Sequence, residues 1–198
     1  MSRFKKLLTL CLFPLMLLGC SGEASNQWNG HDITGVMPDL AFELTNHNGE
    51  PVTAEDYRGK VKLMFFGYTS CPHVCPVALR KLAAATRDLG EQADRVEILF
   101  VAVDPARDKK VLDDYVTNFT PNLVGLTGTQ AQLKEVAKRY RVAFSYGEPQ
   151  EDGFYIVNHS GAVFAFGPQG KPRLLIDEET KTADITEDLR HLLEESSS

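Results

Sequence analysis

Two cysteines four positions apart, Cys71 and Cys75, are the side chains of this chain best suited to chemistry. They lie in the segment Cys71-Pro72-His73-Val74-Cys75-Pro76, directly after an apolar run over 61–68. Thiolates at the end of a strand, with a helix starting behind them, can bind a soft metal ion or exchange electrons. The other two of the four cysteines lie within the first twenty residues.

The surroundings of the two thiols favour a functional pair. Pro76 suits the first turn of the helix that follows, and the positive end of that helix should make at least one thiol more acidic than a free cysteine. The spacing is one residue wider than the C-x-x-C of thioredoxins, so the sulfurs can reach one metal ion or close a disulfide. A purely structural disulfide is the alternative, although a loop this short would stabilise the fold little.

A metal ion held by two thiolates has room for a third ligand, and the chain has five histidines. Copper suits sulfur plus imidazole, whereas zinc prefers four ligands. His73 lies between the cysteines, and His159 lies in a predicted loop at the edge of the sheet. The remaining three are His31 in a polar stretch, His47 at a predicted turn and His191 on an amphipathic helix. Because a histidine in a loop is more often solvent-exposed than a ligand, the residues alone leave the third ligand open.

The spacing of apolar residues predicts the elements that must position these groups. Strands are expected at 40–44, 51–52, 61–68, 96–103, 122–126, 153–157 and 162–166, and helices at 77–89, 109–119, 129–140 and 185–193. Strands that alternate with crossover helices imply a partly parallel sheet covered on both faces. The predicted fold is therefore α/β and thioredoxin-like, with a central mixed sheet flanked by helices and an N-terminal hairpin. The strands at 153–157 and 162–166 are expected to pair, with His159 in their connection.

The N-terminus has the features of an exported lipoprotein. A basic segment over 3–6 precedes an apolar run over 7–18, which is shorter than the roughly 20 residues a spanning helix needs. The run ends in Leu17-Leu18-Gly19-Cys20, which resembles a bacterial lipobox. We expect a signal peptide over 1–19, a lipidated Cys20 followed by a flexible tether over 20–35, and a folded domain over 36–195. The alternative is an ordinary secretory leader that leaves Cys20 as a free thiol.

The net charge of the chain disfavours one class of binding partner. The chain has 21 basic and 27 acidic residues, and its leader holds three basic residues and no acidic one. The mature part therefore has 18 basic and 27 acidic residues, a net charge of −9. Such a balance disfavours nucleic acid as a partner. The lipid anchor would hold the domain on the extracytoplasmic, periplasmic side of a membrane.

Three segments occur in a distinctive order and spacing. They are Phe66-Gly67-Tyr68-Thr69-Ser70-Cys71-Pro72-His73-Val74-Cys75-Pro76, Val101-Ala102-Val103-Asp104-Pro105-Ala106-Arg107-Asp108 and Tyr155-Ile156-Val157-Asn158-His159-Ser160. Together they resemble the Sco/SenC family, thioredoxin-like copper proteins of cytochrome oxidase assembly, over most of 38–176. The resemblance implies that Cys71, Cys75 and His159 bind one copper ion per chain. It also implies that Asp104 supports the site without binding the metal.

The resemblance implies a function as well. It predicts a membrane-anchored metallochaperone that delivers copper to the binuclear copper centre of a cytochrome c oxidase subunit. Other periplasmic thiol or copper proteins are further expected partners. The main alternative is a thiol–disulfide reductase, in which Cys71 and Cys75 are catalytic and His159 is not needed. A peroxide-reducing enzyme would need a proline that is missing ahead of Cys71, and an interaction domain with a structural dithiol is the simplest alternative.

Three positions depart from the family pattern. His73 stands where the family usually has Asp between the cysteines, and Asn158 stands where it has Asp before the ligand histidine. Both changes remove a negative charge near the site, which is expected to weaken the attraction for a cation modestly. His73 also offers an alternative imidazole. After Phe166, Gly167-Pro168-Gln169-Gly170 replaces the usual Asp-Pro-x-Gly.

Overall fold

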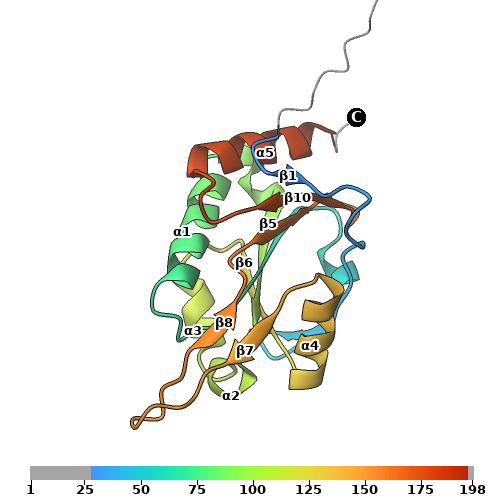
Figure 1. The fold of residues 1–198 in the computed structure, drawn as a ribbon. Helices are drawn as coiled ribbons and strands as arrows, with labels where there is room; N and C mark the ends of the chain where they lie inside the picture. Colours follow the sequence, from blue (N-terminus) through green and yellow to red (C-terminus); the bar gives the residue numbers. More distant parts are fainter. Residues whose placement is uncertain (1–27, 196–198) are drawn as a thin grey trace, which may run out of the picture.

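A central sheet of eight strands organises the computed structural model, which describes residues 28–195 (Figure 1). Its order is β1-β10-β9-β4-β5-β6-β2-β3, and β7 and β8 form a separate pair. The strands are β1 (His31–Asp32), β2 (Glu43–Asn46), β3 (Pro51–Thr53), β4 (Val61–Gly67), β5 (Val96–Ala102), β6 (Leu123–Thr127), β7 (Phe144–Tyr146), β8 (Val157–His159), β9 (Val163–Phe166) and β10 (Pro172–Ile176). The predicted mixed sheet and N-terminal hairpin, β2–β3, are confirmed.

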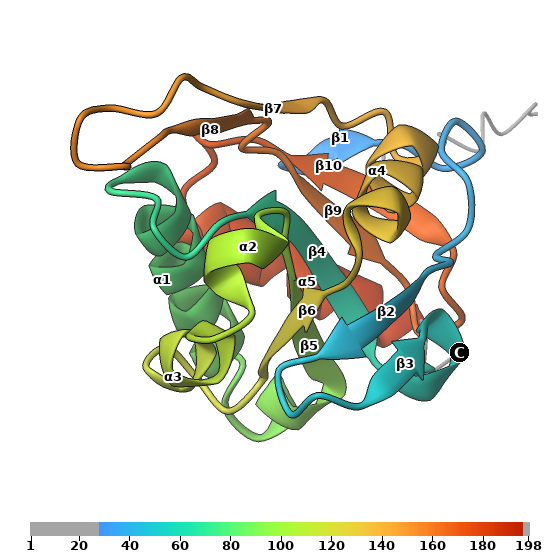
Figure 2. The same ribbon diagram turned by 90° about the horizontal axis from the view of Figure 1, so that it is seen from below.

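Helices cover both faces of this sheet. They are α1 (Val74–Arg87), α2 (Pro105–Asp108), α3 (Leu112–Thr117), α4 (Gln130–Arg139) and α5 (Thr182–Glu195), with short 3-10 helices η1 (Ala54–Tyr57) and η2 (Gly90–Arg95). Figure 1 shows α1 and α4 on opposite sides of the sheet, and α5 next to α1. Figure 2 shows α2 and the start of α1 side by side near one end of β4.

The strands in the middle of the sheet are almost wholly apolar because both of their faces are covered. β4 pairs in parallel with β5 and antiparallel with β9, and β5 pairs in parallel with β6. Every residue of β4 is buried, as expected for a strand covered on both faces. The carboxyl ends of β4 and β5 meet at one edge, where the Val103 N–H donates to the Gly67 carbonyl at 2.8 Å. The loops that carry Cys71 and Asp104 therefore leave the sheet side by side.

The predicted pairing of 153–157 with 162–166 is wrong. β8 pairs with β7, and Phe144 lies opposite His159. β9 has no free edge for β8, because β4 and β10 occupy both of its sides. His159 therefore ends a strand of a small separate ribbon instead of lying in a hairpin loop.

Two other predicted boundaries change. The helix expected at 109–119 is shortened to α3, and a separate short helix, α2, with Pro105 in its first turn, precedes it. The tether expected over 20–35 overlaps the fold, because β1 pairs with β10. The buried carboxylate of Asp188 on α5 also accepts the Asn29 and Gly30 N–H groups at 2.9 and 2.8 Å. The packed domain thus begins before residue 36.

The predicted signal peptide over 1–19 and the predicted lipidation site Cys20 lie outside the described residues. Within residues 28–195, no helix is both long enough and apolar enough to cross a membrane.

One buried charge in the core has a consequence for stability. Lys62 on β4 is fully buried, and its Nζ donates to the Pro168 carbonyl at 2.9 Å. Burial, with a smaller contribution from nearby Arg58, lowers the pKa of Lys62 from 10.5 to about 8. Between these two values the unfolded chain binds more protons than the folded protein, so the contribution of Lys62 makes stability rise with pH in that window.

Replacing Lys62 by methionine should remove this pH dependence. From about pH 7.5 to about pH 9.5, we expect the free energy of unfolding of the wild type to gain about 1–2 kcal/mol relative to Lys62→Met. Urea unfolding at the two pH values measures the difference. Lys171→Met, which changes an exposed lysine, is the control and should follow the wild type. Equal pH dependence in the wild type and Lys62→Met would contradict the assignment.

Candidate metal centre

The structure brings the three predicted ligands together. The donor atoms of Cys71, Cys75 and His159 all lie within 4.8 Å of one another, and Cys75 Sγ is 3.3 Å from His159 Nε2. Both cysteines are free thiols. Cys75 is fully buried, whereas Cys71 and His159 are partly exposed. This is the one cluster of three such donors found in residues 28–195.

The ring of His159 is oriented for metal binding. Its Nδ1 lies 2.9 Å from the Ser160 carbonyl, which can only accept, so Nδ1 carries the proton. The lone pair of Nε2 then faces the sulfur of Cys75. Phe65 and Tyr68 contact the ring edge to face, with centroid distances of 6.0 and 5.9 Å. A carbonyl and two aromatic rings thus fix the imidazole before any metal arrives.

The two sulfurs have different environments at the start of α1. Burial raises the pKa of the Cys75 thiol, so the expectation that the helix makes a thiol more acidic does not hold for this cysteine. A bound cation would reverse this effect, because a metal favours the thiolate. The Cys75 N–H donates to Cys71 Sγ at 3.4 Å, which fixes the second sulfur beside the helix N-terminus.

The site opens into a cavity of about 250 Å³, and Cys71 and His159 are among its lining residues. Two sulfurs and one imidazole form a donor set that suits copper, whereas structural zinc would need a fourth protein ligand. The residues present therefore fit a copper ion that another molecule can reach through the cavity.

The other three histidines lie elsewhere. His47 Nδ1 accepts the Gly125 N–H at 3.2 Å, and the ring of His191 packs against Trp28. His31 lies 3.6 Å from the Asp177 carboxylate. None of these three belongs to the donor cluster.

Asp104 belongs to a buried hydrogen-bond network beside the site, which sequence reasoning found only in part. Its carboxylate accepts the Tyr155 hydroxyl at 3.0 Å and a bond from Arg107 Nε. Arg107 also donates to the Tyr155 carbonyl at 3.0 Å and lies 3.7 Å from the centre of the Tyr155 ring. Tyr155 precedes β8, so these contacts hold the segment that leads to His159.

Asp108, which sequence reasoning missed, connects the same network to the cysteine loop. It is fully buried and accepts the Thr69 N–H at 2.8 Å and the Thr69 hydroxyl at 2.6 Å. Its other oxygen accepts the Asp104 N–H at 3.0 Å. The only signal in the sequence is that Asp108 ends the second of the three segments. The network therefore joins the loop before Cys71 to the segment before β8, the strand that ends at His159.

Gly67 is a second residue that sequence reasoning missed. A Cβ at this position would lie 2.8 Å from Cys75 Sγ and 2.7 Å from Phe100 Cε2. Real Cβ atoms essentially never approach so closely, so only glycine lets the buried sulfur pack against the end of β4.

Two of the departures from the family pattern lie at the site and one does not. His73 is the exposed N-cap residue of α1, and Asn158 is exposed on β8. The turn over 167–170 joins β9 to β10. It lies beside the amino end of β4, because Phe166 pairs with Lys62, whereas the cysteines follow the carboxyl end of that strand.

Comparison with known proteins identifies the family of this chain. The profile described as SCO1/SenC matches residues 37–194. The chain belongs to this family. It is 40% identical to the mitochondrial SCO1 homologue of Mus musculus, over 73% of this chain and 52% of that protein. It is 41% identical to the mitochondrial SCO1 homologue of Homo sapiens, over 66% of this chain and 44% of that protein. The chain thus spans about half the length of the curated relatives it matches.

Solved structures of family members confirm the thioredoxin-like fold. The copper-bound ScoI of Bradyrhizobium japonicum is 34% identical with a TM-score of 0.71, over 78% of this chain and 98% of that one. The copper-bound yeast Sco1 is 30% identical with a TM-score of 0.72, over 79% of this chain and 90% of that one.

Adding a methyl group at Gly67 should disturb the site directly. We expect Gly67→Ala to lose about 1–3 kcal/mol of unfolding free energy, because the buried sulfur and the Phe100 ring must both move. Gly167→Ala is the matched control, since its Cβ would meet nothing closer than 3.9 Å. Denaturant unfolding measures both variants. Equal losses in the two would show that the predicted clash does not occur.

Removing the charge of Asp108 should loosen the cysteine loop. The amide of Asp108→Asn can replace only one carboxylate oxygen as an acceptor, so a buried N–H loses its partner at a cost of about 1–3 kcal/mol. Chemical unfolding measures the loss, and Asp113→Asn on the exposed side of α3 should change little. A wild-type unfolding midpoint for Asp108→Asn would refute the role of the network.

Proposed function

We propose that this chain is a metallochaperone that binds one copper ion through Cys71, Cys75 and His159. It would deliver this ion, its cargo, to the binuclear copper centre of a cytochrome c oxidase subunit. The observation that carries the proposal is the convergence of two free sulfurs and one oriented imidazole nitrogen within 4.8 Å. The copper-bound relatives from Bradyrhizobium japonicum and yeast support the identity of the metal.

The difference in burial among the ligands suits a protein that must release its metal. Cys71 and His159 are partly exposed at the cavity, so donor groups of an acceptor can replace them one at a time. Cys75 is buried and would be the last ligand to dissociate from the copper ion. Because its thiolate is costly without a cation nearby, Cys75 would take up a proton as the copper leaves.

The proposed cellular position rests on the N-terminal sequence. A signal peptide over 1–19 and a lipid on Cys20 would hold the domain at the extracytoplasmic face of a membrane. A SCO1/SenC family lipoprotein from Bacillus anthracis, 26% identical with a TM-score of 0.65, supports this arrangement.

Thiol–disulfide exchange is the second candidate function. It is favoured by the free state of both cysteines and by the partial exposure of the Cys71 sulfur, which a partner's disulfide can reach. This chemistry does not need His159. A His159→Ala variant that keeps full reductase activity toward a disulfide substrate would show that the two functions can be separated.

Loss of the imidazole should weaken copper binding. We expect the reduced wild type to hold about one copper ion per chain, and His159→Ala to bind it at least about tenfold more weakly in competition with a chelator. His31→Ala, which removes an exposed histidine outside the cluster, is the control. Metal analysis with thiol titration gives the stoichiometry. Unchanged affinity in His159→Ala would remove this residue from the site.

A further inference from the structure

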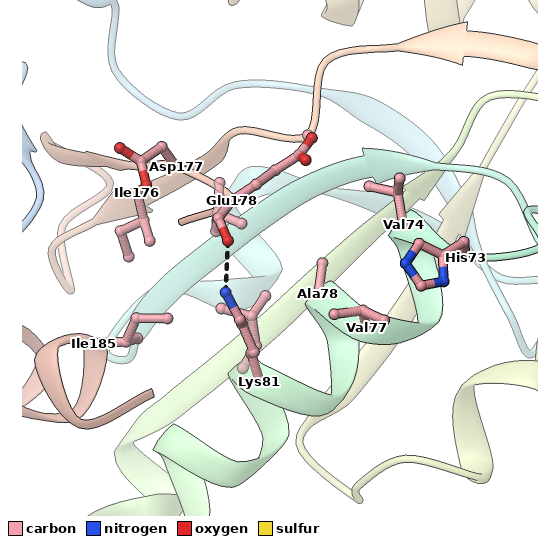
Figure 3. Close-up of a pocket in the computed structure, with 12 residues that line it drawn as sticks. His73, Val74, Val77, Ala78, Lys81, Ile176, Asp177, Glu178 and Ile185 are labelled. Atoms are coloured by element: carbon pink, nitrogen blue, oxygen red, sulfur yellow. Dashed lines mark hydrogen bonds between the residues drawn. The ribbon is translucent and has the colours of Figure 1, made fainter. Parts of the chain in front are cut away.

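Two more metal-binding side chains line the cavity of the copper site. They are the imidazole of His73 and the carboxylate of Glu178, and both residues are exposed. Neither side chain belongs to the cluster of three donors. They also line a neighbouring cavity of about 120 Å³ between α1 and the segment after β10, which Figure 3 shows, so the two cavities share these residues.

Glu178 is held beside the loop that follows His159. Lys81 Nζ on α1 donates to the carbonyls of Glu178 and Thr180 at 2.5 and 3.0 Å, which fixes the backbone of this segment (Figure 3). A Cβ at Gly161 would lie 1.7 Å from Glu178 Oε1. The carboxylate therefore occupies the space that glycine leaves, two residues after the ligand histidine.

His73 occupies the corresponding place beside the cysteines. It is the N-cap residue of α1, two residues after Cys71 and two before Cys75. Figure 3 shows its ring at the N-terminal end of α1, with Glu178 on the opposite wall of the neighbouring cavity. Among the described residues, the ring of His73 and the carboxylate of Glu178 make no hydrogen bond or ion pair with a protein group, so both are available to an ion in the cavity.

We propose that His73 and Glu178 form an outer copper site at the mouth of this cavity, distinct from the three-ligand site within it. The inference rests on the proposed function, since it describes how copper reaches Cys71, Cys75 and His159. Imidazole and carboxylate are the donors that Cu(II) accepts, whereas two thiolates with one imidazole favour Cu(I). The outer site would hold Cu(II) weakly, and the ion would pass to the sulfurs as Cu(II) by exchange of ligands, with no change of oxidation state in this step.

A chain without thiols isolates the outer site, because free thiols can reduce Cu(II). In the full chain carrying Cys71→Ser and Cys75→Ser, we expect titrated Cu(II) to give an EPR spectrum of nitrogen and oxygen ligation. Adding His73→Asn or Glu178→Gln to this chain should weaken that binding by about tenfold. Glu179→Gln, at the next exposed residue, is the matched control and should leave the affinity within about twofold.

Copper binding to the thiol-free chain tests the outer site, and copper binding to the wild type tests the proposed function. Cu(II) binding that is absent in the thiol-free chain, or that His73→Asn and Glu178→Gln leave unchanged, would overturn the outer site. The wild type could still hold one copper at its three ligands in that case. If the wild type held no copper, the chaperone proposal would fail whatever the thiol-free chain showed. Both residues are exposed, and the thermal unfolding midpoint verifies that each variant is folded.

Discussion

The metal centre depends on a buried polar network that ties together two parts of the chain lying in different sheets. β8, which carries His159, is not hydrogen-bonded to the central sheet, so strand pairing does not fix its distance from the cysteines. Asp108 holds Thr69 in the cysteine loop, and Asp104 with Arg107 holds Tyr155 ahead of β8. Because both carboxylates are buried, leaving their partners unpaired would be costly, so these bonds help to hold the cysteine loop and the segment before β8 in place relative to each other.

The sheet topology places the two loops that carry the cysteines and the buried carboxylates next to each other. Parallel β4 and β5 end at the same edge of the sheet, so the loops after them start next to each other. One loop leads into α1 with both cysteines, and the other leads into α2 with the two carboxylates. The strand behind the loop, β4, is fully buried and holds Cys75 at its depth. Its buried sulfur, the partly exposed Cys71 and the carbonyl-oriented His159 together give a site that is preorganised yet accessible at one side.

The sequence predicted those parts of the site that are local. Cys71 and Cys75 are close because four residues at a helix start separate them, and the apolar run before them predicts a buried strand. His159 could be assigned only through the resemblance to a family, since no local pattern fixes its distance from residues more than eighty positions earlier. The strand pairing around it was predicted wrongly because the sequence pattern indicated neither β7, which has only three residues, nor β10, and these two strands are the partners of β8 and β9. The contacts of Gly67, Asp108 and Glu178 exist only in the folded chain.

X-ray absorption at the copper edge of the reduced, Cu(I)-loaded protein identifies the atoms that hold the metal. We expect a first shell of two sulfurs and one imidazole nitrogen, because the donor atoms of Cys71, Cys75 and His159 already lie within 4.8 Å of one another. A shell of sulfur alone, or of light atoms alone, would contradict it, since the imidazole or the thiolates would then take no part in holding the metal.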